Sequence, residues 1–271
     1  MMSNDLKHHG IKGQKWGVRR FQNKDGSLTP AGRSRYATGE HGKFMGQDRD
    51  SDIRIKTGSN AYRLQAKDKL RGSGQSYISL DKLDHLKYID VTSAGESGLL
   101  INATSDDPEL GHSIKMKIDN ELVIPAYSKS IDAFIKASKN IGIEEVAKQV
   151  ERPEYPGKQF IKDMENLSVT EVRDRAYKHF MGTLMRDSKA KTEFFNDLKK
   201  QGYNAVIDEW DVDFGKGFAK SSVIIFEQKD VKQVESKRLD EWDAEYASNP
   251  DWFNKSDNEN AKKVAKRWKN Y

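Results

Sequence analysis

The chain of 271 residues contains no cysteine. This absence excludes disulfides, thiolate metal sites, iron–sulfur clusters and a cysteine nucleophile. Long apolar runs are missing too, since Val223–Phe226 is typical and a bilayer span needs about 20 apolar residues. With no export signal at the N-terminus, we expect a soluble protein made in a reducing cytoplasm, with no membrane partner.

Apolar content is low, at 35% of residues against 33% charged residues. A folded core is still expected, because 11 Phe, 10 Tyr and 5 Trp can each bury a large area. The composition therefore predicts a modest core with solvated tails.

The net charge of +5 belongs to one end of the chain. Residues 1–50 hold ten Lys or Arg and five acidic residues, whereas the other 221 residues hold 37 of each sign. A balanced main region argues against a broad nucleic-acid-coating surface there.

Residues 1–52 are predicted to form a basic, glycine-rich arm, because eight glycines fall in the first fifty residues and no helical or strand period is sustained. Cations alternate with an aromatic residue in one cluster of this arm: Lys12, Lys15, Trp16, Arg19 and Arg20. Such a cluster suits docking on a partner, and an acidic protein is favoured over nucleic acid. The alternative is a solvated arm without a partner.

Beyond the arm, short strands and helices are expected to mix. The predicted strands cover residues 61–64, 75–80, 113–124, 203–208 and 221–226. The predicted helices include residues 81–89, 128–139 and 189–201, the last of which ends at Gly202. Two further helices are predicted after capping-box matches, one at residues 168–171 and one that begins at residue 256 near the end of the chain.

Few residues suggest chemistry by themselves. Three histidines of the arm, at 8, 9 and 41, lack acidic partners and indicate a metal site only weakly. Acids at positions 208, 209, 211 and 213 follow a predicted strand, where they could bind a cation or act as a base, or simply line a solvated loop. Arg63 lies between apolar Tyr62 and Leu64, where it either grips a phosphate or carboxylate or faces water by alternation.

The words HHGIKGQKWGVRR and DGSLTPAGRSRY within residues 8–36 resemble an N-terminal segment of head-associated and structural proteins of tailed phages and prophages of Gram-positive bacteria. The resemblance implies a docking or packaging segment. It also implies phage head or portal proteins as partners, with the protein located in the virion and in the host bacterial cytoplasm.

Residues 53–236 are similar to ADP-ribosyltransferase-like domains, on the words AYRL, YISL, GYNAVIDEWD and SSVIIFEQKDVKQV. The resemblance implies an α+β fold with a mixed sheet and flanking helices, and NAD as cofactor. It assigns NAD binding to Arg63, Tyr62 and Tyr77, and catalysis to Ser79 and Glu209. The usual catalytic glutamate is replaced here by Ser221–Ser222, so Glu209 is the nearest acid. Residues 237–271 remain as a charged C-terminal tail with one helix.

Three functions follow from these features. The first is a head-associated phage protein whose transferase-like domain has lost catalysis. The second is an active NAD-dependent ADP-ribosyltransferase that enters the host and modifies a host protein. The third is a nucleic-acid-binding accessory protein that acts through the arm.

Overall fold

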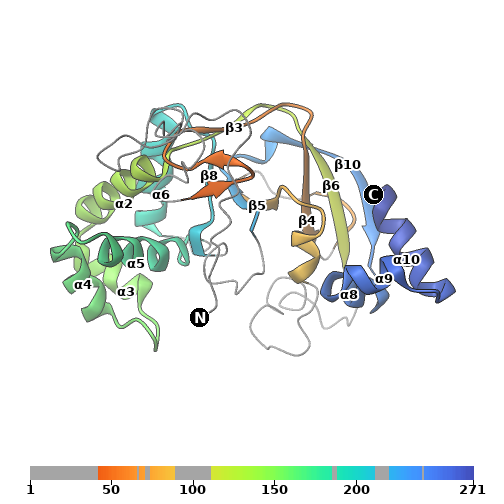
Figure 1. Ribbon diagram of the computed structural model, residues 1–271. Coiled ribbons are helices and arrows are strands. Elements are labelled where there is room, and N and C mark those ends of the chain that lie inside the picture. Colours follow the sequence, from red (N-terminus) through yellow and green to blue (C-terminus); the bar gives the residue numbers. More distant parts are fainter. Residues whose placement is uncertain are drawn as a thin grey trace, which may run out of the picture.

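The computed structural model of the protein has a six-stranded sheet at its centre, with helices at both ends of that sheet (Figure 1). The structure describes residues 42–65, 67–70, 74–88, 111–184, 188–210, 220–239 and 241–271. The docking cluster of the arm, the three arm histidines and the acids at 211 and 213 lie outside the described residues.

The α+β class expected from the sequence is confirmed, but the sheet is antiparallel in every described pair and not mixed. In sheet order its strands are β10 (Val231–Arg238), β6 (His112–Ile118), β4 (Asn60–Gln65), β5 (Ser76–Ser79), β9 (Ser222–Ile225) and β8 (Ala205–Ile207). The expectation of a mixed sheet is wrong, and the connection of β4 to β5 shows one reason. Residues 66–75 are too few for the crossover that parallel neighbours need.

Two small ribbons cover one face of this sheet. They pair β1 (Lys43–Phe44) with β2 (Gln47–Asp48), and β3 (Ile53–Ile55) with β7 (Leu122–Ile124). Phe44 and Ile53 pack in one apolar cluster with Ala61 and Ile78 of the sheet. We call this side the ribbon face. Because Phe44 is buried in it, the folded body already includes residues that the sequence assigned to the arm.

The opposite side, the helix face, carries Tyr62 and Leu64 of β4. One group of helices covers the end of this face near β8 and β9 (Figure 1). It contains α2 (Tyr127–Ile141), α3 (Ile143–Val150), α4 (Gly157–Glu165), α5 (Thr170–Met181) and α6 (Lys189–Lys200). The helices predicted at 128–139 and 189–201 are thereby confirmed, and Gly202 ends the second of them at a φ of 90°. The predicted capping box at 168–171 is wrong, because Val169 precedes α5 and makes no side-chain cap.

A second group of helices covers the other end of the helix face. It contains η1 (Asp84–Tyr88), α8 (Glu241–Ser248), α9 (Pro250–Lys255) and α10 (Glu259–Asn270). The short helix η2 (Gln228–Asp230) lies elsewhere, between β9 and β10. Trp268 is fully buried against Tyr62 and Leu64, and its indole nitrogen donates to Asp243 at 2.6 Å. The helix α10 therefore packs on the helix face of the sheet.

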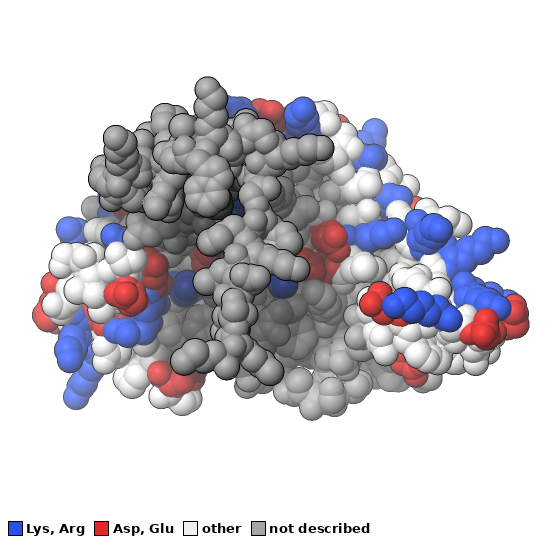
Figure 2. Space-filling model, viewed as in Figure 1, with Lys and Arg blue, Asp and Glu red and all other residues white. Residues whose placement is uncertain are grey.

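The visible surface carries both charge signs. Figure 2 shows Lys and Arg side chains gathered over the region of α9 and α10, with acidic side chains among them. None of the helices that the structure describes is long and apolar enough to cross a membrane.

Candidate functional site

Four polar side chains form a line across the helix face, one on each of four neighbouring strands or strand ends. Tyr62 of β4 pairs with Ser79 of β5, and Ser79 pairs with Ser222 of β9. The backbone N–H of Asp208, just after β8, donates to the carbonyl of Ser222 at 3.1 Å. Residues directly opposite in an antiparallel pair share a face, so these four side chains make one polar row.

The polar row is closed to solvent. Its members are between 2% and 4% exposed. Tyr62 stacks on the imidazole of His85 with ring centroids 5.2 Å apart, and burial raises its pKa. A row this buried contributes to packing, and ligand access to it would require movement of the groups that cover it.

The Ser79 hydroxyl braces the ends of β5 and β9. Its Oγ lies 2.8 Å from Oγ of Ser221 and donates to the carbonyl of Asp81 at 2.9 Å. The Ser221 hydroxyl in turn donates to the Asp84 carboxylate at 2.8 Å. The family resemblance assigns Ser79 to catalysis, whereas here its hydroxyl braces a turn and a serine of the next strand.

Glu209 is held in a buried ion pair with Arg49. The guanidinium of Arg49 donates to Oε1 of Glu209, and the two side chains are 11% and 4% exposed. Arg49 also lies over the ring of Tyr127, 5.0 Å from its centroid. Burial alone would lower the pKa of Arg49, but the carboxylate of Glu209 outweighs that effect and the pKa is raised.

The same carboxylate affects the two tyrosines beside it. Burial and, after it, the charge of Glu209 raise the pKa of Tyr127 and the pKa of Tyr177. Both phenols therefore stay neutral over the whole physiological range. The cluster of Arg49, Glu209, Tyr127 and Tyr177 anchors the loop after β2 to the helices beneath it, since the backbone N–H of Tyr127 donates to the carbonyl of Arg49 at 2.8 Å.

Arg63 lies on the ribbon face, across the sheet from Tyr62 and Ser79. Successive side chains of a strand point to opposite faces, and Ala61 of the same strand packs in the ribbon-face cluster. The Nη1 atom of Arg63 is buried and has no hydrogen-bond partner among the described residues, and burial lowers the pKa of Arg63. Arg63 makes no ion pair with any residue that the structure describes.

Tyr77 occupies the helix face one row away from Ser79. It pairs with Ile224 of β9 and lies, partly buried, at the margin of the core formed by α2–α6. The structure thus brings Tyr62, Tyr77 and Ser79 to one side of the sheet. It places Arg63 on the other side and Glu209 in an ion pair.

This arrangement does not fit NAD bound as the resemblance implies. One NAD molecule would have to contact Arg63 on the ribbon face and Ser79 on the helix face at once. These residues therefore do not form one site at which NAD could react. Among the described residues there is also no group of three or more His, Cys, Asp or Glu side chains that could hold a metal ion.

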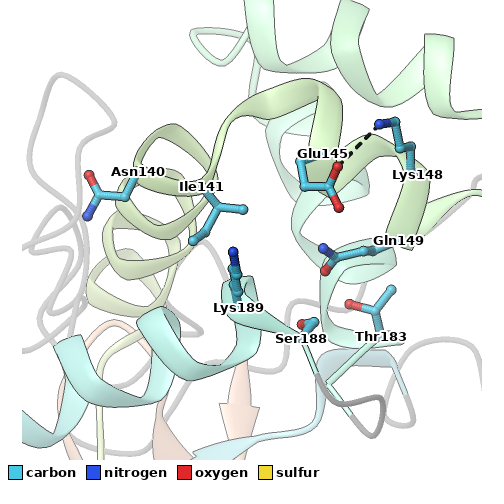
Figure 3. Close-up of a pocket in the computed structure, with 8 residues that line it drawn as sticks. All are labelled: Asn140, Ile141, Glu145, Lys148, Gln149, Thr183, Ser188 and Lys189. Carbon is cyan, nitrogen blue, oxygen red and sulfur yellow. Dashed lines mark hydrogen bonds and ion pairs between the residues drawn. The ribbon is translucent and has the colours of Figure 1, made fainter.

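A polar pocket lies apart from the polar row, between the end of α2, α3 and the start of α6 (Figure 3). It has a volume of about 720 Å³, and Lys148 within it is paired with Glu145 at 3.2 Å. None of the site residues expected from the sequence lines this pocket.

Sequence reasoning missed Arg49, Ser221 and Asp84 as members of these clusters. Arg49 was assigned to the arm, and Ser221 was noted only as a replacement for a glutamate. Residues 45–46 read Met-Gly rather than Asn-Gly or Asp-Gly, so no local turn signal indicated that the folded body begins before Arg49.

Comparisons of the chain with protein-family models, with curated proteins and with solved structures found no match. The likeness to phage head proteins and to ADP-ribosyltransferases rests on the sequence words alone.

Proposed function

We propose that this chain is a phage head-associated accessory protein. Its basic N-terminal segment docks on head or portal proteins, and its folded body is a binding domain without transferase activity. The docking role is supported by the words HHGIKGQKWGVRR and DGSLTPAGRSRY and by the charge confined to the first fifty residues. Docking through a basic segment is favoured by an acidic partner surface.

One observation carries the second half of the proposal: the Arg63, Ser79 and Glu209 side chains do not converge. ADP-ribosyl transfer needs a cation at the pyrophosphate and a carboxylate beside the developing ribosyl cation within one site. Here Arg63 is across the sheet from Ser79, and Glu209 is paired with Arg49. The body therefore retains polar and apolar surfaces for binding and lacks the arrangement for transfer.

The experiment is incubation of the full chain with labelled NAD and host lysate, alongside thermal unfolding with and without NAD. We expect no label transfer and no NAD-dependent change in the unfolding midpoint. Transfer of label by the natural chain, lost in Glu209→Gln and in Arg63→Met, would overturn the proposal and favour the transferase alternative. The variant Arg173→Met serves as the control, because it removes an arginine outside this set.

A further inference from the structure

A cleft opens where the β1–β2 turn lies beside the first residues of β4. Its volume is about 570 Å³, within the range of about 300–1,000 Å³ typical of small-ligand sites. The side chains that matter for its chemistry are Met45, Arg54, Lys56, Leu80 and Lys82. Neither Ser79 nor Glu209, the residues assigned to catalysis, lines it.

The turn above this cleft carries an unsuitable residue. Lys43–Phe44 pairs with Gln47–Asp48, so Met45 and Gly46 form a two-residue hairpin turn with φ of 48° and 80°. Turns of this kind take Asn, Asp or Gly at the first position, because a side chain at positive φ is strained. Met45 is the only described non-glycine residue with positive φ.

Neither folding nor solubility explains Met45. Its side chain is 48% exposed, so it gains little from burial, and its backbone conformation disfavours it. Strain kept at an exposed position points to a contact that the residues described by the structure do not supply. Because Met45 lines the cleft, that contact is with a ligand that presents an apolar surface.

The charged side chains that line the cleft determine which sign of ligand charge it favours. Asp81, the only acid in the lining, is occupied as an acceptor, since its Oδ1 takes the N–H groups of Leu83 at 2.7 Å and Asp84 at 3.1 Å. The cleft also holds Arg54, Lys56 and Lys82.

Two of these three cations have partners that do not cancel the positive charge that they bring to the cleft. Among the described residues, Lys82 donates only to backbone carbonyls of α10. Arg54 forms an ion pair with Glu121 in which both side chains are largely exposed. Lys56 forms no ion pair with any described residue. A surface pair such as that of Arg54 is weak, so an anion entering the cleft meets a net positive lining.

We propose that this cleft binds a small organic anion with a flat apolar body, such as an aromatic carboxylate. The ring would lie between Met45 and Leu80, and the anionic group would face Lys56. The inference rests on the cleft and on the strained turn, and it stands whether or not the protein docks on a phage head.

The test uses the full chain with ¹³C-labelled methionine methyl groups and 2-naphthoate as the probe. We expect the Met45 methyl signal to shift through the ring current of the bound naphthalene, while the buried Met116 and Met181 stay unmoved. A Met45 methyl signal that does not move at millimolar probe would overturn the proposal.

Two variants separate binding from folding. Met45→Asn is expected to raise the thermal unfolding midpoint, because Asn suits this turn, and to weaken 2-naphthoate binding about fivefold or more. Lys56→Gln is expected to weaken binding with no change in the midpoint, whereas the exposed control Lys263→Gln should alter neither. Unchanged affinity in Met45→Asn or in Lys56→Gln would contradict the proposal.

Discussion

Two arginines, Arg49 and Arg63, are buried in this fold in different electrostatic settings. Arg49 meets the carboxylate of Glu209, and its pKa is raised in spite of burial. Arg63 has no counter-charge among the described residues, and burial lowers its pKa. The contrast leads us to expect a structural role for Glu209, since removal of one partner of a buried ion pair leaves the other charge uncompensated.

The Arg49–Glu209 pair should behave as one unit. Removing either partner leaves a buried charge, so Arg49→Met and Glu209→Gln should each lower the free energy of unfolding by about 3–5 kcal/mol. The double variant should lose less than the sum of the two, with a coupling of about 2 kcal/mol or more. Urea unfolding of the four proteins measures this cycle. Additive losses, or an unaffected Glu209→Gln protein, would show that the carboxylate is not structural.

His85 should make stability depend on pH. It is 2% exposed, its Nε2 lies 2.6 Å from the Ser113 hydroxyl, and burial lowers its pKa to about 3. Below about pH 6.5 the unfolded chain binds a proton at this residue that the folded protein does not, so stability falls as pH falls toward 3. Between pH 7 and pH 5 the loss due to His85 is about 2 kcal/mol.

The matched comparison for His85 is the variant His85→Gln, which keeps a polar group but does not titrate. Burial also lowers the pKa of His179, to about 4, and this second contribution cancels between the two proteins. Urea unfolding at both pH values should show a smaller pH-dependent loss in the variant. Equal losses would mean that His85 does not remain neutral in the folded state.

At the level of elements, strongly periodic segments were predictable from the sequence. The apolar spacing of 128–139 gives α2, the spacing of 189–201 with its glycine gives α6, and the apolar runs on either side of residue 215 give β8 and β9. In each case the signals that predict the element lie within about a dozen neighbouring residues, and tertiary contacts reinforce the local preference.

Elements fixed by distant contacts were not predictable. Strand β10 reads as charged sequence, because Val231 is its one buried residue and the strand forms by pairing with β6. The polar row and the Arg49–Glu209 pair join residues far apart in the chain, so no local spacing could reveal them. The side of the sheet taken by Arg63 follows from the register of β4 with β5, which the sequence does not specify.

The packing of α10 on the sheet is expected to be required for stability. Trp268 is fully buried among Tyr62, Leu86 and Tyr246, so Trp268→Ala should lower the free energy of unfolding by about 3–5 kcal/mol. Trp252 of α9 is 47% exposed and provides the control, because Trp252→Ala should change stability far less. Equal effects in urea unfolding would indicate that residues 237–271 are a dispensable tail.

At the scale of the whole molecule, charge and fold divide the chain into parts with different expected roles. The residues after position 50 carry equal numbers of both signs, and they make the six-stranded sheet, both helix groups and most of the lining of the cleft below Met45. The basic excess and the phage-like words lie before that point. This division supports docking by the N-terminal segment and ligand binding by the body.

Incorporation into phage particles tests the central claim most directly. Purified particles should be compared for the full chain, for a chain lacking residues 1–41, and for a chain in which Trp16, Arg19 and Arg20 are replaced by alanine. The deletion leaves the described body intact, so thermal unfolding of the free proteins serves as the control. We expect the full chain to be present in particles and both altered chains to be depleted about tenfold or more, as loss of a charged docking contact implies. Unchanged incorporation of the deleted chain would contradict it.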